Sequence, residues 1–256
     1  MPARRDPHRP RPPAPADDWA LFLDVDGCLL EFADTPDAVT VPAALPATLA
    51  ALARRLDGAV ALVSGRSLAS IDRLFAPLQL PVSGLHGMEH RSTVRHVAAP
   101  PAPAALDAIR NEALQIALAY PGALVEDKGP ALGLHWRAAP QAASALRNFA
   151  EVALPRLPGY GVQHGDHVVE LRPASSDKGS AILALLDEVP FRGRVPVFVG
   201  DDLTDENGFA VVNAHGGLSI LVGGREPSAA HFGLRDPVAV HDWLAATSPH
   251  HQESIP

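Results

Sequence analysis

Acidic and hydroxyl side chains follow three apolar, strand-like runs of this sequence. They are Asp24 and Asp26 after the first run, Ser64 after the second, and Asp201, Asp202 and Asp205 after the third. Ligands in an open α/β sheet bind beyond the carboxyl ends of the strands, so we expect these side chains to share one edge. Carboxylates in one cleft repel each other unless a cation lies among them, and hard oxygen ligands without a Cys or His cluster favour Mg²⁺.

Two further features add phosphate chemistry to this edge. Lys178 and Gly179 stand where a helix is expected to begin, and an ammonium beside a helix N-terminus binds phosphate well. In the Asp24-x-Asp26 pair, a turn beginning at Val25 lets the second carboxylate reach a leaving group. One carboxylate then attacks phosphorus while the other gives and takes a proton. The residues therefore predict phosphoryl transfer.

Each of these residues also has a structural interpretation. Asp24 and Asp26 suit a turn, Ser64 suits a helix N-cap, and Asp202 and Asp205 suit the acidic preference of helix N-termini. The order of four motifs, DVDG, VSGR, a Lys-Gly helix start and GDDLTDE, is more specific than any one of them. We therefore favour a catalytic interpretation.

Composition limits the class of protein. The 256 residues are 47% hydrophobic and 20% charged, and their apolar runs are strand-sized, which indicates a folded chain without membrane spans. The net charge of −8 argues against a nucleic-acid partner. The single cysteine, Cys28, excludes an internal disulfide and fits a reducing compartment. Residues 1–17 lack the hydrophobic segment of a secretory signal, so we expect a cytoplasmic protein. We also expect a monomer that acts on a small molecule.

Lysine is scarce in this chain. Of the 21 cationic residues, 19 are Arg and two are Lys, namely Lys128 and Lys178. Base-composition bias explains the scarcity, but lysine is hard to replace where a compact ammonium is needed instead of a planar guanidinium. The count therefore draws attention to these two positions.

Strand and helix patterns alternate in two blocks. Pro42 is expected to open a helix through Leu56, and Ser67 is a better N-cap than Ser64 for the next helix. We predict an α/β fold, with a Rossmann-like core and a mostly parallel sheet formed by residues 18–97 and 173–248. An inserted α+β domain of pattern αββαββ is expected at 98–172. Residues 1–17, rich in Pro and Arg, are predicted to be a disordered tail, and residues 249–256 a frayed one.

The motif order resembles that of the haloacid dehalogenase-like (HAD) phosphatases and, within them, the trehalose-6-phosphate phosphatases. The resemblance extends over roughly residues 21–244. The matching segments are LDVDGCLL at 23–30, LVSGR at 62–66, GLHGME at 84–89, VEDKG at 125–129, LHWR at 134–137, VELRP at 169–173, DKG at 177–179 and GDDLTDE at 200–206. The resemblance implies a Mg²⁺-dependent hydrolase that acts on trehalose 6-phosphate, with the inserted domain as a mobile cap.

The resemblance also implies roles for the core residues. Asp24 would be the nucleophile that forms an aspartyl-phosphate, and Asp26 would protonate the departing sugar oxygen and then activate water. Ser64 and Lys178 would hold the transferring phosphoryl group. Mg²⁺ would be bound by Asp24, the backbone carbonyl of Asp26, and Asp201.

Two roles are open for each of the remaining site residues. Asp202 and Asp205 would ligate Mg²⁺ through water or orient Lys178. The cap residues that match family positions facing the disaccharide hydroxyls are Glu126, Lys128, Arg137 and Glu170, and a solvated strand face is their structural alternative.

Three core residues near these motifs stay ambiguous. Arg66 is assigned to substrate binding, with a surface salt bridge as the alternative. His86 suits a packed or hinge-adjacent histidine, and Glu89 lies near the site by resemblance.

The resemblance leaves three points open. Most relatives have Thr where this chain has Cys28, and since a thiol is a weaker donor we expect activity to persist with less dependence on this position. Other functions considered are a phosphatase of sucrose 6-phosphate or hexose phosphates, a hexose-phosphate phosphomutase, and a catalytically silent sugar-phosphate sensor. Since no synthase-like domain is attached, we expect the preceding enzyme to be a separate chain.

Overall fold

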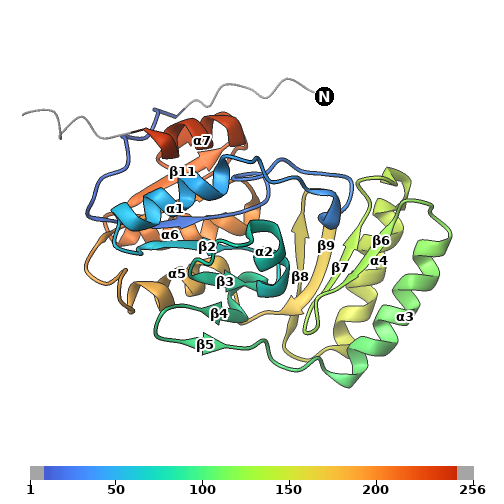
Figure 1. The fold of residues 1–256 in the computed structure, drawn as a ribbon. Helices are drawn as coiled ribbons and strands as arrows, with labels where there is room; N and C mark the ends of the chain where they lie inside the picture. Colours follow the sequence, from blue (N-terminus) through green and yellow to red (C-terminus); the bar gives the residue numbers. More distant parts are fainter. Residues whose placement is uncertain (1–8, 247–256) are drawn as a thin grey trace, which may run out of the picture.

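Six parallel strands of the larger sheet end at the same edge, and the main cavity lies beyond this edge. The computed structural model describes residues 9–246, which form two lobes, each with its own sheet (Figure 1). The larger sheet has the order β12-β11-β10-β1-β2-β3-β4-β5. Its strands are β1 (Trp19–Leu23), β2 (Val60–Val63), β3 (Val82–Gly84), β4 (Glu89–Arg91), β5 (His96–Val97), β10 (Val195–Gly200), β11 (Leu218–Val222) and β12 (Phe232–Leu234). The strands from β12 to β3 are parallel, and β4 and β5 are antiparallel.

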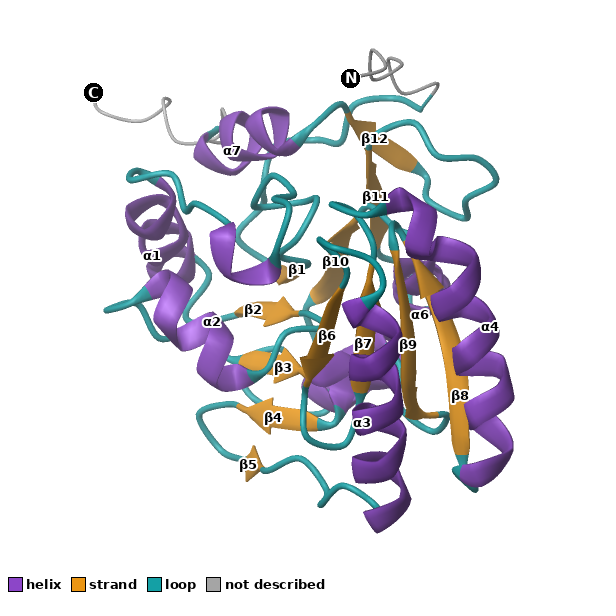
Figure 2. Ribbon diagram, turned by 90° about the vertical axis from the view of Figure 1, so that its right-hand side faces the viewer, coloured by secondary structure: helices purple, strands orange, loops and turns teal. Residues whose placement is uncertain are grey.

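Helices cover both faces of this sheet, which is why its central strands are apolar throughout. The helices are α1 (Leu45–Arg55), α2 (Leu68–Phe75), α5 (Lys178–Leu186), α6 (Glu206–Ala214) and α7 (Pro237–Ala245). In Figure 2, α1 and α2 lie on one side of the sheet and α6 lies on the other. All five residues of β1 are buried, as expected for a parallel strand covered on both faces. The predicted α/β class with a mostly parallel sheet is confirmed.

The smaller sheet is antiparallel and has the order β6-β7-β9-β8. Its elements are α3 (Ala104–Leu118), β6 (Leu124–Asp127), β7 (Leu132–His135), α4 (Ala143–Ala153), β8 (Tyr160–Gly165) and β9 (Val168–Pro173), in the predicted αββαββ sequence. Both helices pack on the face of the sheet that points away from the larger lobe (Figures 1 and 2). This lobe, residues 104–173, is called the cap below, and the rest is called the core. The cap has its own apolar cluster around Leu134 and Trp136.

Short 3₁₀ helices complete the connections. They are η1 (Pro36–Ala38), η2 (Leu85–Gly87), η3 (Pro140–Ala142), η4 (Leu154–Arg156) and η5 (Leu203–Asp205). Two of them, η2 and η5, follow core strands at the edge that faces the cap. They therefore carry side chains into the cavity described below.

The local elements differ from the expected ones at one helix start and at three short strands. The first helix begins at Leu45 and not at Pro42, because residues 42–45 form a turn in which the Leu45 amide donates to the Pro42 carbonyl at 3.0 Å. Pro46 occupies the first helical turn instead, where its missing N–H costs no helical hydrogen bond. The strands β4, β5 and β12 were not predicted, since each has only two or three residues and no clear alternation. The expectation that Ser67 caps α2 is confirmed, because its side chain accepts from the Ser70 amide at 3.2 Å.

The N-terminal segment is packed on the core, so the prediction of a disordered tail is wrong for residues 9–17. The Trp243 indole donates to the Pro13 carbonyl at 2.7 Å, and the Gly233 amide donates to the Pro10 carbonyl at 3.0 Å. Arg9 pairs with Glu226 at 2.7 Å. Proline carbonyls remain good acceptors although proline lacks an N–H, and the core supplies the donors. The remainder of the predicted tail, residues 1–8, and the predicted frayed end, residues 249–256, lie outside the described residues.

Within residues 9–246, no helix has both the length and the apolar composition that a bilayer crossing needs.

Candidate active site

The site residues expected from the sequence lie together between the edge of the larger sheet and the cap. Strand β1 lies between β10 and β2, with Leu23 paired to Val199 and to Leu62. The residues that follow these three strands therefore emerge side by side, as expected for parallel strands. A cavity of about 170 Å³ lies beyond them. Its walls include Asp24, Asp26, Ser64, Arg66, Lys178, Asp201 and Asp202 from the core and Glu126, Lys128, Arg137 and Glu170 from the cap.

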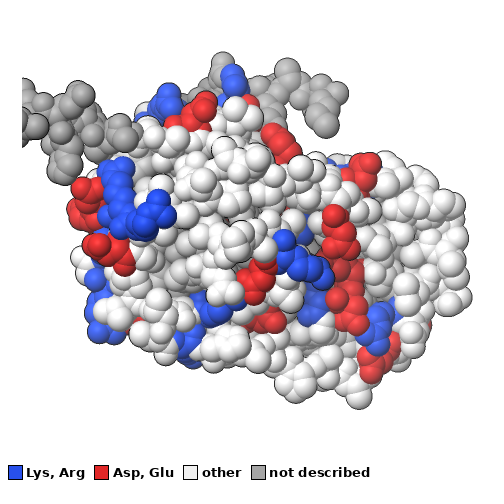
Figure 3. All heavy atoms as spheres, viewed as in Figure 1, with Lys and Arg blue, Asp and Glu red and all other residues white. Residues whose placement is uncertain are grey.

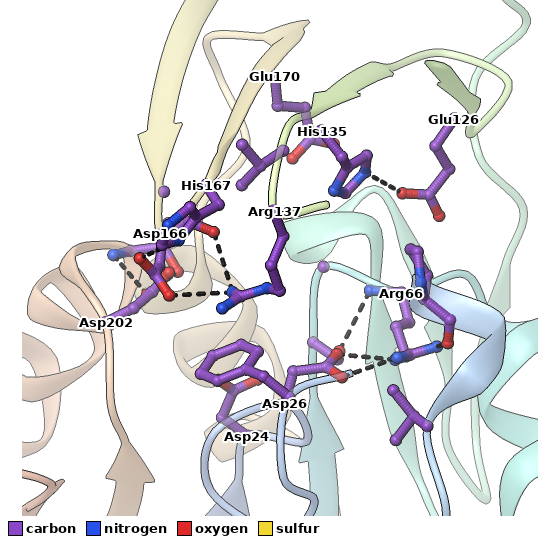
Figure 4. Close-up of a pocket in the computed structure, with 18 of the residues that line it drawn as sticks. Asp24, Asp26, Arg66, Glu126, His135, Arg137, Asp166, His167, Glu170 and Asp202 are labelled. Atoms are coloured by element: carbon purple, nitrogen blue, oxygen red, sulfur yellow. Dashed lines mark hydrogen bonds and ion pairs between the residues drawn. The ribbon is translucent and has the colours of Figure 1, made fainter. Parts of the chain in front are cut away.

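Figure 4 shows how the two lobes share this cavity. Asp24 and Asp26 rise from the core, while Glu126, His135 and Glu170 descend from the cap. On the outer surface, acidic and basic side chains gather along the seam between the two lobes (Figure 3). The polar groups of the cavity therefore continue a charged boundary and are not isolated within an apolar interior.

Lys178 is a buried cation on the core side of the cavity. Its ammonium lies 2.9 Å from Asp24 Oδ2 and 2.7 Å from Asp205 Oδ1, and the residue is only 2% exposed. The position is fixed because Lys178 is the first residue of α5, which Asp177 caps through the Ser180 amide at 2.8 Å. Burial alone would lower the pKa of Lys178, but the adjacent carboxylates hold that pKa well above its usual value. The side chain is therefore charged.

Asp205 uses both carboxylate oxygens on protein donors. Oδ1 accepts from Lys178, and Oδ2 accepts from the backbone amides of Asp201 at 2.8 Å and Asp202 at 3.0 Å. A side chain at Gly200 would collide with this carboxylate, since a Cβ there would lie 2.4 Å from Asp205 Cγ. Asp205 is fully buried and is absent from the cavity wall. Of the two roles expected for it, this geometry fits the orientation of Lys178 and not metal ligation.

The strongest candidate for a cation site is the group formed by Asp24, Cys28 and Asp201. One ligand atom from each lies within 4.8 Å of the others. Gly27 permits this approach: it has a positive φ of 79°, and a Cβ there would lie 2.1 Å from Asp201 Oδ2. Burial raises the pKa of Asp24 and Asp201 well above the usual range, and the neighbouring carboxylates raise both further. A divalent cation would relieve this repulsion, so the oxygen donors fit Mg²⁺.

Asp202 lies beside this group, and Cys28 is its one member that is not a carboxylate. Asp202 Oδ1 accepts from the Thr204 amide at 2.8 Å and the Thr204 hydroxyl at 2.6 Å, which leaves its other oxygen for the cavity. The Cys28 thiol is fully buried and lies 3.8 Å from Asp201 Oδ1. Burial raises the pKa of this thiol, and Asp201 raises it further. Cys28 is therefore a protonated weak donor to Asp201.

Arg66 contacts Asp26 and not the cap. Its Nε and Nη2 donate to the two oxygens of Asp26, each at 2.7 Å, and its Nη1 donates to the Pro36 carbonyl at 3.0 Å. Arg66 is only 8% exposed, so the alternative of a surface salt bridge is wrong. Burial would lower the pKa of Arg66, but Asp26 outweighs this effect and raises it. Asp26 is thus held in a planar, two-point contact.

Ser64 is buried beside this pair. Its Oγ accepts from the Arg66 amide at 3.1 Å, and the residue is 1% exposed. Because Ser67 is the N-cap of α2, the structural alternative for Ser64 does not apply. The Ser64 hydroxyl keeps its hydrogen available at the cavity wall.

Three cap residues form one charged group. The Lys128 ammonium lies 3.3 Å from Glu170 Oε1 and 3.7 Å from Glu126 Oε2. Gly133 of β7 pairs with Glu126 on one side and Glu170 on the other, which places the two carboxylates on the same face of the sheet. Glu170 is 5% exposed, so a freely solvated strand face does not describe it. Its pKa is held far below the usual value because Lys128 and His86 outweigh the effect of burial.

Arg137 is held at the tip of the β8–β9 hairpin. Its Nη2 donates to Asp166 Oδ2 at 2.9 Å and to the Asp166 carbonyl at 3.2 Å. Its guanidinium carbon lies 4.7 Å from the centre of the Phe32 ring, which belongs to the core. Arg137 therefore joins cap and core through a cation–π contact, and Figure 4 shows its guanidinium joined to Asp166 by dashed lines.

Several cavity residues were not assigned from the sequence. Among them are Phe32, His86, His135, Asp166 and His167. The signal for His135 was its place in the LHWR segment, and in the structure its Nε2 lies 2.9 Å from Glu126 Oε2. Glu89 is not among the residues of the cavity wall: its carboxylate accepts from the amide of Leu68, the first residue of α2, at 2.6 Å.

Comparison with known proteins gives consistent matches. The chain matches the family described as trehalose-phosphatase over residues 22–237. It is 45% identical to a probable trehalose-phosphate phosphatase of Sinorhizobium fredii, over 85% of this chain and 82% of that protein. It is 44% identical to the trehalose-6-phosphate phosphatase of Escherichia coli, over 88% of this chain and 85% of that protein.

Solved structures share the same fold. A trehalose-6-phosphate phosphatase related protein superposes with a TM-score of 0.69 at 26% identity, covering 88% of this chain and 94% of that one. A HAD-superfamily phosphatase from Bacteroides thetaiotaomicron gives a TM-score of 0.56 at 19% identity, covering 88% of this chain and 92% of that one. The expected Rossmann-like core with a mostly parallel sheet and an inserted α+β lobe is thereby confirmed.

Proposed function

The chain belongs to the trehalose-phosphatase family, and from that premise we propose that it hydrolyses trehalose 6-phosphate to trehalose and phosphate. As a member of this family it is a phosphoric monoester hydrolase. One observation carries the assignment of the site. The buried pair of Asp24 and Lys178 faces a cap whose Glu126, Lys128 and Glu170 are already gathered over it.

Mg²⁺ is the proposed cofactor. Asp24, the backbone carbonyl of Asp26, and Asp201 would hold it, with Asp202 contributing through water. When bound, the ion neutralises charge on the transferring phosphoryl group and lowers repulsion between that group and the carboxylates. Asp205 is left out of the ligand set because both of its oxygens are already in use.

The first step is transfer of the phosphoryl group to Asp24. An oxygen of Asp24 forms a bond to phosphorus as the bond from phosphorus to the sugar O6 breaks, and protonated Asp26 gives its proton to that sugar oxygen. Lys178 lies 2.9 Å from Asp24 and, together with Ser64, would bind the phosphoryl oxygens. Trehalose leaves, and an aspartyl-phosphate remains.

The second step is hydrolysis of this aspartyl-phosphate. Asp26, now a carboxylate, takes a proton from water as the water oxygen bonds to phosphorus, and the bond from phosphorus to Asp24 breaks. Phosphate leaves, and both aspartates return to their starting states. Arg66 supports this exchange, because its two hydrogen bonds fix the position and orientation of Asp26.

Recognition of the sugar is proposed to rest on the cap. Charged donors and acceptors in a closed site discriminate polyols, since a wrong sugar leaves one of them unpaired. Glu126, Lys128, Arg137 and Glu170 would meet the hydroxyls of the disaccharide. The cavity of about 170 Å³ is smaller than the roughly 300–1,000 Å³ of usual ligand pockets. Entry of a phosphorylated disaccharide therefore requires the cap to move away from the core.

The experiment is a phosphate-release assay with Mg²⁺ across trehalose 6-phosphate, sucrose 6-phosphate and glucose 6-phosphate. We expect trehalose 6-phosphate to be preferred, and Asp24→Asn to be inactive on all three. Equal rates on all sugars would remove the specific assignment and leave a general sugar phosphatase. An Asp24→Asn variant as active as the wild type would show that the nucleophile is wrong.

A second variant separates sugar recognition from chemistry. Lys128→Ala should lose affinity for trehalose 6-phosphate but keep hydrolysis of p-nitrophenyl phosphate, a small ester that needs no cap contact. Loss of both activities would mean that Lys128 serves the chemical step and that the assigned recognition role is wrong.

A further inference from the structure

One contact from the cap and one contact within the core converge on Gly65. The Lys128 ammonium donates to the Gly65 carbonyl at 3.1 Å. The His86 ring packs on the other side, so that a Cβ at Gly65 would lie 2.5 Å from His86 Nε2. Gly65 stands between Ser64 and Arg66, both in the cavity wall. One of the points where the cap meets the core therefore lies in residues 64–66, which we call the catalytic loop.

His86 is held in an unusual backbone conformation for a non-glycine residue. It lies in η2 with φ 54° and ψ 34°, in the left-handed region, where histidine is one of the better tolerated residues. Its amide donates to the Ser64 carbonyl at 3.0 Å, and the residue is 7% exposed. Such conformations persist where the surroundings determine them and are concentrated at functional sites.

The polar side of the His86 ring faces the cap. His86 Nε2 lies 3.3 Å from Glu170 Oε2, while Nδ1 is buried without a hydrogen-bond partner among residues 9–246. Burial lowers the pKa of His86, and the pKa of Glu170 is also low, so a neutral ring meets a carboxylate. In that state Nε2 carries the hydrogen and donates it to Glu170.

These contacts close a ring of four groups. Glu170 Oε2 meets His86, Glu170 Oε1 lies 3.3 Å from Lys128, Lys128 meets the Gly65 carbonyl, and Gly65 meets the His86 ring. Two members come from the cap and two from the core. Removing the His86 donor would leave Glu170 held by Lys128 alone, and both groups would lose a fixed place relative to the catalytic loop.

We propose that His86 is a positioning residue that acts through Glu170 and sets where the Lys128–Glu170 pair meets the sugar relative to the phosphoryl site. This inference rests on the proposed function, because it assumes that the cap groups bind a sugar phosphate. It assigns no proton transfer to His86. Its effect should therefore be confined to substrates that engage the cap.

The test compares His86→Asn with His86→Gln. Asparagine tolerates the left-handed backbone but is too short to reach Glu170, whereas glutamine places its amide donor near the position of Nε2. With trehalose 6-phosphate, we expect kcat/KM of His86→Asn to fall about 10- to 100-fold, the loss of one charge-assisted hydrogen bond. Hydrolysis of p-nitrophenyl phosphate should stay within about twofold, and His86→Gln should recover most of the lost kcat/KM.

Two controls distinguish positioning from damage. His90 is a buried histidine of β4 whose Nε2 lies 3.3 Å from Glu188, away from the cavity, so His90→Asn removes the same kind of contact elsewhere and should leave both activities unchanged. In a Glu170→Gln background, His86→Asn should lower kcat/KM for trehalose 6-phosphate less than about threefold. A residue that acts through the Glu170 carboxylate has little effect once that carboxylate is removed.

The outcomes separate cleanly. Equal losses on both substrates, no recovery by His86→Gln, or full additivity with Glu170→Gln would each overturn the proposal. If the wild type does not hydrolyse trehalose 6-phosphate, the proposed function fails first. Hydrogen exchange without substrate then tests the contact alone: faster exchange of the β9 amides in His86→Asn supports the anchoring of Glu170, and unchanged exchange refutes it.

Discussion

Arg66 binds Asp26 through two parallel hydrogen bonds of 2.7 Å, which run from Nε to one carboxylate oxygen and from Nη2 to the other. The planar guanidinium matches the planar carboxylate, which fixes both the position and the orientation of Asp26. The sequence assigned Arg66 to substrate binding, but its donors are directed to Asp26 and to the Pro36 carbonyl. Its main contribution is therefore expected on the chemical step.

Arg66→Lys should lower kcat about 10- to 100-fold with little change in KM, because one ammonium cannot make the two-point contact and Asp26 becomes loosely placed. Arg91 supplies a matched control, since it binds Asp72 through two hydrogen bonds of 2.6 and 2.7 Å away from the cavity. Arg91→Lys should leave kcat unchanged. A rise in KM alone for Arg66→Lys would return Arg66 to the substrate-binding role expected from the sequence.

Lys178→Arg should be severely impaired although the charge is kept. The ammonium is 2% exposed and lies between Asp24 and Asp205, where a guanidinium does not fit without moving one of them. Lys178→Met should also lower the free energy of unfolding by about 3–5 kcal/mol, because it leaves buried carboxylates without their cation. Phosphate release and chemical denaturation measure the two effects. Arg156→Lys, at an exposed pair with Glu112, should change neither.

Cys28→Thr should retain activity within about threefold, since the hydroxyl replaces a weak thiol donor to Asp201 at similar volume. The native thiol should also resist iodoacetamide at neutral pH and react only after unfolding, because burial and Asp201 raise its pKa. Mass spectrometry of the alkylated protein reports this directly. Rapid labelling of the native protein would contradict the buried, protonated thiol.

Mg²⁺ should stabilise the protein against heat, because a bound cation relieves the repulsion between Asp24 and Asp201. At an ion concentration about 100 times Kd, mass action gives about 2.7 kcal/mol of added stability. The rise in Tm should vanish with EDTA and in Asp201→Asn. Asp72→Asn, at a remote ion pair, should respond to Mg²⁺ as the wild type does.

Glu170 should make a pH-dependent contribution to stability. Its pKa is lowered in the folded protein, so its stabilising effect is present above the unfolded value of about 4.3 and is lost as pH falls through the folded value. The difference in free energy of unfolding between wild type and Glu170→Gln should therefore be largest near neutral pH and shrink below about pH 4. Glu112→Gln, at an exposed carboxylate, is the control and should show a smaller pH dependence.

The sequence alone determined the chemistry at the sheet edge. Apolar runs that end in Asp24, Ser64 and Asp201 define parallel strands, and parallel strands bring their carboxyl ends together whatever the remainder of the chain does. The two lysines pointed to the same place, since Lys178 lies on Asp24 and Lys128 lies over the Gly65 carbonyl. These signals are local, because each depends on a strand or helix and on the residue at its end.

Only the tertiary structure decided which side chains are partners. The contacts from Lys128 to Gly65 and from His86 to Glu170 join residues 63 and 84 positions apart, across two separately folded sheets. No periodicity or spacing encodes such a contact, because it depends on how the cap is placed on the core. Within the core, packing likewise decided that Arg66, assigned to substrate binding, pairs with Asp26 40 positions away. It also decided that residues 9–17, predicted to be disordered, find donors on the core. Composition reports what a segment can do locally, whereas packing decides which donors and surfaces it meets.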